Sequence, residues 1–252
     1  MHADNLSYDE AVRIVKEMID KTFKTEFLMA LPVTVRPLAS ARISTLVAGT
    51  KKYAADPLAR TTAITRMISH IIRLGIDNGR VKRMIEHVND MHDRSGVEDE
   101  DRIYILSILV VWQRRMIDLY GWRRLTPVEV NALVVTYEVI GRRMHLECMP
   151  GTYEDYEHFV DGYERQHFRE EQINIQMAGL VLTQIRAMSG GIGGRIALAV
   201  QLYSMDELLR KSIGYPALRP VSRAVARAVI RLRRMALRLF RGKGWHPARL
   251  AT

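Results

Sequence analysis

Apolar residues recur at intervals of three and four along most of this chain, and no segment alternates in the way of a half-buried strand. The chain contains no internal repeat. Several helical segments also start with residues that cap a helix, namely Ser7–Glu10, Asp56-Pro57, Thr126–Glu129 and Thr152. The pattern therefore predicts an all-α fold, a single globular, bundle-like domain of about ten helices over residues 1–252.

The caps and breaks divide the chain into expected helices. These are predicted near 7–19, 56–74, 79–94, 99–120, 127–144, 152–167, 173–188, 195–211 and 217–241. A further segment, 24–48, is interrupted by Pro32 and Pro37. The stretch Ile103–Trp112 is apolar nearly all round, so its helix is expected at the centre of the fold. The glycine-rich run Ser189–Gly194 is expected to separate two helices.

A single cysteine, Cys148, excludes an internal disulfide framework and any multi-cysteine zinc or iron–sulfur site. We expect it to pack as a small hydrophobe in a reducing compartment. The polar segment 1–12 lacks the features of a signal peptide, and no window holds the ~18–20 apolar residues of a spanning helix. With 48% apolar and 26% charged residues, the composition is typical of soluble globular proteins. A cytoplasmic location is expected, with peripheral contact to a membrane.

The formal net charge of +10 comes entirely from the end of the chain. From residue 219 onward there are nine arginines, one lysine and no acidic residue. The other 28 basic residues balance all 28 acidic ones. Because the basic pI describes one segment only, it is weak evidence for a nucleic-acid-binding domain, and no specific nucleic-acid partner is expected.

The predicted last helix carries this charge as a stripe at intervals of three and four, formed by Arg219, Arg223, Arg227, Arg231, Arg234, Arg238 and Arg241. Valine, leucine and methionine side chains occupy much of its remaining surface. A basic amphipathic helix of this kind fits an anionic membrane surface or an acidic partner, here through residues 217–243. The alternative is a helix docked on the body whose arginines are only solvated.

One predicted helix, Gly79–Arg94, ends in a polar cluster. After an apolar stripe, the helix carries Asn89, Asp90, His92 and Asp93 in its last turns. An imidazole held rigidly at the end of such a helix could serve as an iron ligand. The alternative is that His92 caps the helix and forms only local hydrogen bonds.

Two further motifs carry less chemical information. Glu164 and His167 have the spacing that places a carboxylate and an imidazole on one helix face, as in one half of a di-iron site. The chain lacks a second such pair with glutamate, and a local surface pair is the alternative. The run Gly190–Gly194 lacks the Lys-Ser/Thr ending of a P-loop and the preceding strand of a dinucleotide-binding turn.

Several stretches, taken in order, resemble one family of helical haem b proteins, the MpaB-type and rubber-oxygenase (latex-clearing protein) catalytic-domain family. The similar stretches are Gly75–Arg80, Met84, Val88–His92, Tyr104–Ser107, Tyr120–Glu129, Gly141–Met144, Met149–Tyr153, Tyr163–Phe168, Leu202–Leu209, Ile213–Pro216 and the arginine-rich last helix. The resemblance covers about 35–243 and lies in the order and spacing of these stretches, since no single one is specific.

This resemblance implies a haem b-dependent oxygenase that uses O₂ to cleave or oxygenate an isoprenoid or lipid-like apolar molecule. It implies that His92 is the axial ligand of the haem iron. Asn89, Asp90 or Asp93 would then fix the orientation of the imidazole. His167 is implied as a further residue of the haem pocket.

On the other side of the haem the resemblance implies Arg60. Thr61, Thr62 and Thr65 lie nearby in the sequence, and Thr61 and Thr65 are the candidates for a further catalytic hydroxyl there, depending on the register of the helix. Family members often carry an Asp-Thr pair after that arginine, whereas this chain has Ala63-Ile64. The apolar substrate is expected between the predicted helices at 56–74, 103–119 and 127–144. The departure at 63–64 favours the alternative, a non-catalytic helical module that binds a membrane or an acidic partner through its tail.

Overall fold

The computed structural model describes residues 6–24, 26, 31–50, 53, 55–57, 59, 63–215 and 217–241. These residues form twelve α-helices, one 3-10 turn and one π-helical turn, and no strand. An isolated bridge pairs Ser40 with Phe168. The predicted single all-α globular domain is therefore confirmed.

The α-helices are α1 (Tyr8–Glu17), α3 (Leu31–Val35), α4 (Ala41–Ala48), α7 (Ala63–Leu74), α8 (Gly79–Ser95), α9 (Asp99–Tyr120), α10 (Pro127–Arg143), α11 (Tyr153–His167), α12 (Gln172–Ser189), α13 (Gly191–Ser204), α14 (Glu207–Ser212) and α15 (Pro220–Arg241). The π-helical turn η2 (Met18–Thr22) follows α1, and the 3-10 turn η3 (Arg36–Ala39) follows α3. The caps predicted at Ser7, Thr126 and Thr152 are confirmed, each with a reciprocal hydrogen bond to the acidic residue three positions on.

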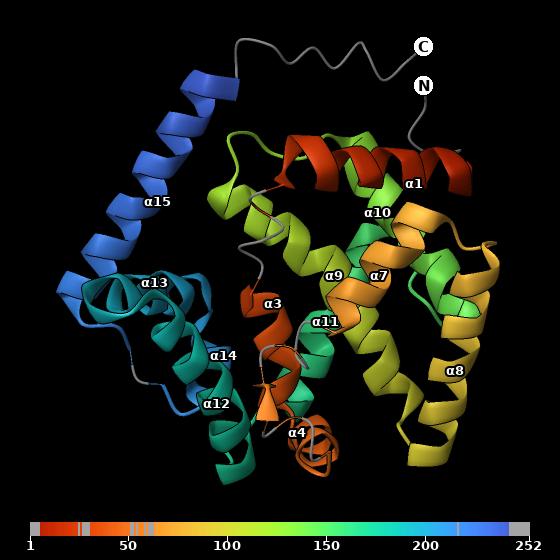
Figure 1. Cartoon of the computed structure of the whole chain (residues 1–252), viewed down its shortest axis with the longest axis horizontal. Coiled ribbons are helices and arrows are strands. Elements are labelled where there is room, and N and C mark those ends of the chain that lie inside the picture. The colour runs from red at the N-terminus through yellow and green to blue at the C-terminus, as the bar shows by residue number, and fades with distance from the viewer. Residues whose placement is uncertain are drawn as a thin grey trace.

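Helix α9 lies at the centre of the fold (Figure 1). Between Asp101 and Tyr120 its buried residues point in every direction around the helix axis. It packs against α3, α10, α11 and α15. The central position predicted for Ile103–Trp112 is therefore confirmed, because a helix that is apolar on all sides has to be covered on all sides.

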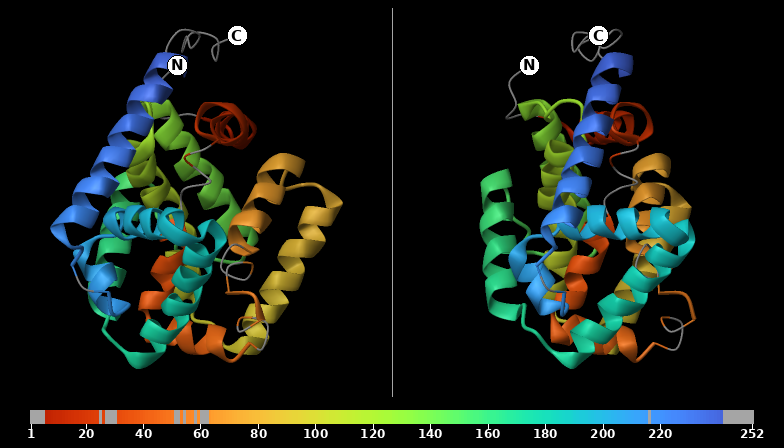
Figure 2. Two further views of the ribbon diagram at one scale, coloured as in Figure 1. Left: turned by 60° about the vertical axis from the view of Figure 1, so that its left-hand side comes forward. Right: turned by 90° about the vertical axis from the view of Figure 1, so that its left-hand side faces the viewer.

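On one side of α9, helix α1 lies across α10, and α7 and α8 form a hairpin (Figures 1 and 2). The turn of this hairpin starts at Gly75, whose φ of 84° is a conformation that favours glycine. It ends at Asn78, whose side chain accepts a hydrogen bond from the N–H of Arg80 at 2.9 Å and caps α8. On the other side of α9, helices α12 to α15 form a second group, in which α13 contacts both α12 and α15.

The break between α12 and α13 is shorter than predicted. Only Gly190 lies outside both helices, and α13 begins at Gly191. Further along, Gly194 passes so close to α12 that a Cβ atom there would lie 2.2 Å from the carbonyl oxygen of Arg186. Gly190 and Gly191 adopt positive φ values of 57° and 40° at the break, whereas Gly194 lets the two helices approach closely, which a prediction from flexibility alone misses.

The single helix predicted over 195–211 is wrong. The backbone leaves the helix at Met205, and Asp206 starts α14 by accepting a hydrogen bond from the N–H of Leu209 at 2.8 Å. Cys148 is exposed rather than packed, since it lies in the turn that follows α10. At the start predicted at Asp56-Pro57, the side chain of Asp56 accepts a hydrogen bond from the N–H of Ala59 at 3.0 Å, as a helix cap does, while positions 58 and 60–62 lie outside the described residues. None of the described helices is long and apolar enough to cross a bilayer.

Candidate functional site

Helix α8 carries His92 on its inward face. Val81, Ile85, Val88 and His92 follow one another at intervals of four, three and four, and so lie along one side of the helix. Val81 and Ile85 are buried, and Val88 and His92 are half-buried. The Nδ1 atom of His92 is shielded from solvent. The imidazole is thus partly enclosed by protein at the end of an apolar stripe.

Asn89 fixes α8 to its neighbours. Its side chain is 3% exposed; Nδ2 donates to the carbonyl oxygen of Arg143, and Oδ1 accepts from Arg102, both at 3.3 Å. Arg102 also donates to the carbonyl oxygen of Met144. Asn89 therefore joins α8 to α9 and to the end of α10, which holds the helix that carries His92 in place.

Of the three residues expected on the other side of a haem, Arg60 and Thr61 lie outside the described residues. Thr65 lies on α7, one turn before the buried Ile68. Its hydroxyl oxygen is buried and has no hydrogen-bond partner among the residues that the structure describes. Leaving such a group unpaired costs about 1–3 kcal/mol, so a ligand that offers a polar atom here would gain a hydrogen bond.

His167 belongs to a polar cluster between α4, α9 and α11. Its Nε2 atom lies 3.3 Å from Glu100, and its ring centroid lies 4.4 Å from that of Tyr163. Arg42 pairs with Glu100 at 2.7 Å and with Asp101 at 2.6 Å, and the Tyr163 hydroxyl donates to Asp101. His167 therefore helps to join α11 to α9, and Arg42 links the same cluster to α4.

A second polar cluster has a fully buried charge at its centre. Arg36 is 0% exposed; its guanidinium forms two hydrogen bonds with Glu164, one of them 2.7 Å long, and lies 2.6 Å from Asp206. The hydroxyl of Tyr104 also donates to Glu164, at 3.0 Å. The guanidinium stacks 3.6 Å from the ring centroid of Trp112. Burial raises the pKa of Tyr104, and the adjacent carboxylate of Glu164 raises it further.

Two roles were expected for Glu164, one half of a di-iron site and a local surface pair with His167. Neither agrees with this arrangement. Its carboxylate is 4% exposed and pairs with Arg36, which is 128 positions away in the sequence. Among the described residues, no group of three side chains could hold a metal ion. The sequence analysis missed Arg36, whose signal was a lone arginine within the apolar stretch 31–39.

The cluster around Arg36 joins three of the stretches on which the family resemblance rests. They are Tyr104–Ser107, Tyr163–Phe168 and Leu202–Leu209. Burial alone would raise the pKa of Asp206, but the charge of Arg36 and the hydrogen bonds from Leu209 and Arg36 outweigh it and lower that pKa below its usual range. These stretches therefore hold the fold together through charged pairs.

Helix α15 is docked on the body by its inner side, where Ala226 and Ile230 are buried. Three of its arginines donate to the carbonyl oxygens at the end of α9: Arg233 to Tyr120, Arg234 to Gly121 and Arg238 to Trp122. Tyr120 is the last residue of α9, so its carbonyl lies at the negative end of the helix dipole, which a cation stabilises. The alternative of a helix docked on the body is therefore correct for its position. Its second part is wrong for these three arginines, which bind protein atoms and are not merely solvated.

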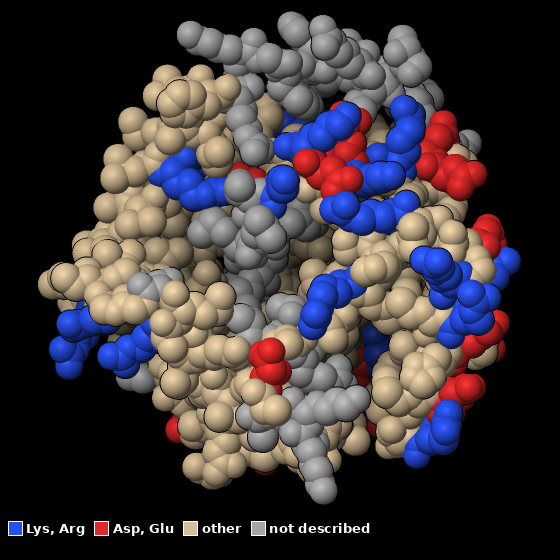
Figure 3. Space-filling model, in the orientation of Figure 1, with Lys and Arg blue, Asp and Glu red and all other residues tan. Residues whose placement is uncertain are grey.

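The outer side of α15 is apolar and uncovered in the described part of the chain. Its large exposed side chains are Val221 (75%), Leu232 (65%), Met235 (60%), Leu239 (68%) and Phe240 (85%). On the face shown in Figure 3, the surface around α15 is largely uncharged with isolated basic groups, whereas acidic and basic side chains alternate around α7 and α8. Helix α15 therefore carries apolar side chains both on the side that packs against the body and on the side that faces solvent.

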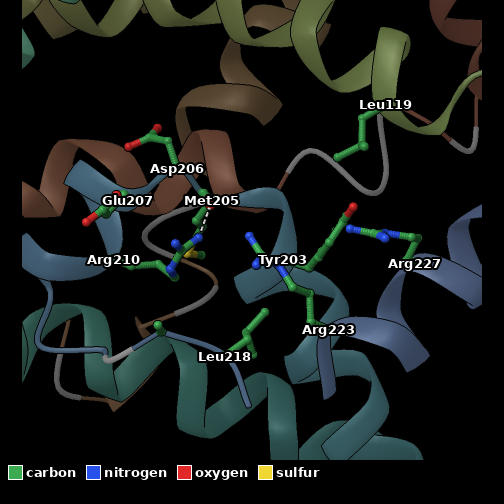
Figure 4. A pocket seen from close by; sticks show the side chains of 10 residues that line it. Leu119, Tyr203, Met205, Asp206, Glu207, Arg210, Leu218, Arg223 and Arg227 are labelled. Atoms are coloured by element: carbon green, nitrogen blue, oxygen red, sulfur yellow. Dashed lines mark hydrogen bonds between the residues drawn. The ribbon is translucent and has the colours of Figure 1, made fainter. Parts of the chain in front are cut away.

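A cavity of about 480 Å³ lies where α13, α14 and α15 meet the end of α9. Its walls are formed by Leu119, Tyr203, Met205, Asp206, Glu207, Arg210, Ala217, Leu218, Arg223 and Arg227. Figure 4 shows the side chains of Arg210 and Arg223 reaching into it from opposite sides. From the sequence, Arg223 and Arg227 were assigned only to the basic stripe of the last helix, because the cavity is formed by segments that only the fold brings together.

No protein-family profile and no curated protein sequence matches this chain. The likeness to the MpaB-type and rubber-oxygenase family therefore rests on short stretches in a shared order.

Proposed function

We propose that this protein binds haem b through His92 and is a haem-dependent, oxygenase-like protein that acts on an apolar, isoprenoid or lipid-like small molecule. The observation that carries the proposal is the half-buried imidazole of His92 at the end of the inward stripe of α8. It is supported by the ordered stretches that resemble the haem family, and by the buried Thr65 hydroxyl that has no partner among the described residues.

In this proposal His92 holds the haem iron, while Asn89 and Arg102 keep its helix in position. The Thr65 hydroxyl is available to donate a hydrogen bond to a polar group beside it. Partly buried apolar side chains on the same two helices exclude water, namely Ile64, Met67, Met84 and Val88. Haem b, when bound, supplies an iron that activates O₂. Ala63-Ile64 replaces the polar pair common in the family, so haem binding and oxygenase activity have to be tested separately.

The visible spectrum of the purified full-length protein, with and without added haemin, tests haem binding. We expect a Soret band in the wild-type protein and its loss in His92→Ala, because the iron loses its protein ligand. His87→Ala is the matched control: His87 is an exposed histidine of the same helix, and its replacement should leave the band unchanged. A colourless protein that takes up no haemin, or an unchanged band in His92→Ala, would contradict the proposal. Oxygen uptake with an isoprenoid oligomer then measures the activity.

A second candidate function rests on a different observation, the uncovered apolar face of α15. We propose that this face binds an anionic membrane surface. The apolar side chains lie beside a row of arginines, of which Arg227 and Arg231 are exposed. This combination allows apolar side chains to enter the head-group region while the cations pair with anionic lipids.

Paired substitutions on the outer face of α15 test membrane binding without removing the helix. Leu232→Ser/Leu239→Ser is expected to weaken binding to vesicles rich in phosphatidylserine by about ten-fold or more, since each leucine contributes roughly 1.5–3 kcal/mol when buried. Vesicle co-sedimentation measures the effect. Leu74→Ser/Leu180→Ser removes two exposed leucines from other helices (47% and 41% exposed) and should bind as the wild type does. Equal binding by all three proteins would argue against the proposal.

A further inference from the structure

The cavity between α9, α13, α14 and α15 has the composition of a small-ligand site. Its volume of about 480 Å³ lies within the range of ~300–1,000 Å³ that is common for such sites. Apolar side chains, including Leu119 and Leu218, form part of its wall, and arginines form another part. It lies on the side of α9 away from α8, so it is separate from His92 (Figure 1).

Each of the two carboxylates in its wall lies beside a cation outside the wall. Asp206 lies 2.6 Å from Arg36 and also accepts the N–H of Leu209. Glu207 lies 2.7 Å from Lys211. Asp206 shares Arg36 with Glu164, and Glu207 also attracts Arg210, so these two carboxylates offset only part of the charge of the three arginines in the wall.

Three guanidinium groups remain in the wall. Arg210 is held in position by the carbonyl oxygens of Leu202 and Met205, which orient it but carry no full charge. Arg223 and Arg227 have no carboxylate within ion-pair distance among the described residues. The cavity therefore carries an excess of positive charge.

We propose that this cavity binds a small amphiphile through its phosphate group, with the phosphate on Arg223, Arg227 and Arg210 and the apolar part against Leu119 and Leu218. A phosphate monoester carries about −1.5 to −2 charges at pH 7, and so matches several guanidinium groups at once. Planar guanidinium groups also form paired hydrogen bonds with phosphate oxygens. The Tyr203 hydroxyl in the same wall is a further hydrogen-bond donor.

Calorimetric titration of the full-length protein with dihexanoyl phosphatidic acid, kept below its micellar concentration, tests the proposal. Arg223→Gln and Arg227→Gln should each weaken binding roughly ten-fold or more, and the double variant should abolish it, because each removes a charge-assisted hydrogen bond. Arg195→Gln/Arg231→Gln is the matched control. It removes two exposed arginines of α13 and α15 that do not line the cavity, and should bind as the wild type does.

Two further arms identify the source of the phosphate. Inorganic phosphate should bind more weakly than the amphiphile, and Leu218→Ser should weaken only the amphiphile. If the two ligands bind equally and Leu218→Ser has no effect, the cavity binds a free anion and the proposal of an amphiphilic ligand is overturned. Leu232→Ser/Leu239→Ser should leave binding unchanged, which separates the cavity from the outer face of α15. Absence of binding by both ligands, or unchanged binding by a correctly folded Arg223→Gln/Arg227→Gln, would overturn the proposal entirely.

Discussion

Replacing Arg36 by alanine is expected to lower the free energy of unfolding by about 3–5 kcal/mol, because it leaves the buried carboxylate of Glu164 without its partner. The same change removes the stacking of the guanidinium on Trp112. Urea unfolding followed by circular dichroism measures the effect. No exposed arginine of this protein should approach that value, since a surface ion pair contributes only about 0–1 kcal/mol.

A paired substitution separates the lost charge from the lost contacts. In Arg36→Met/Glu164→Gln both charges are absent while most of the side-chain volume remains, so most of the stability lost in Arg36→Ala should return. Asp206, the other partner of Arg36, has a side chain that is 37% exposed and can be solvated. Equal losses in the single and the paired variant would show that packing, rather than an unpaired charge, dominates at this position.

Gly194→Ala is expected to lower the free energy of unfolding by about 1–3 kcal/mol, although alanine normally favours a helix. The added Cβ would lie 2.2 Å from the carbonyl oxygen of Arg186, and backbone atoms there can move only if α12 and α13 separate. The expected loss therefore arises from the close approach of the two helices and not from the conformation of the glycine itself. Thermal and urea unfolding give the measurement.

Gly179→Ala is the matched control for this effect and should have the opposite sign. Gly179 also lies within a helix, α12, but a Cβ added there would meet no atom within 4 Å. We expect a gain of about 0.5–1 kcal/mol from the better helix propensity of alanine. If both variants lost stability, the contact with Arg186 would not be the cause.

Much of the fold could be predicted from local rules. Three capping boxes mark helix starts at Ser7, Thr126 and Thr152, and each is present in the structure. The central position of α9 followed from an apolar surface without a polar face. Both features could be predicted because each depends on the residues of the helix itself: the cap on the first residues, and the burial on the helix surface.

Both errors arose where the spacing of side chains along the chain was the only signal. The apolar period continues through Leu202, Met205 and Leu209, so it conceals the break that Asp206 makes by capping α14. Likewise, the spacing of Glu164 and His167 suggested a local pair, whereas the partner of Glu164 comes from η3. Spacing along one helix indicates which side chains share a face, but not what covers that face.

The candidate haem residues show the same limit. His92 could be singled out because the apolar stripe of α8 leads to it, and the structure gives it a half-buried position on that stripe. Asn89 was expected to orient His92 directly, but its side chain bonds to Arg102 and to the end of α10. The cavity lined by Arg223 and Arg227 could not be predicted, since its walls come from four helices and the segment before α15.

The buried pairs of Arg36 also constrain how the chain folds as it is synthesised. Glu164 and Asp206 follow Arg36 by 128 and 170 positions, so the ribosome must produce most of the chain before both partners exist. Until then the guanidinium group remains hydrated, and the segments around it cannot settle in their final positions without burying an unpaired charge. Completion of the core should therefore be a late event in folding, one that waits for the region after α13.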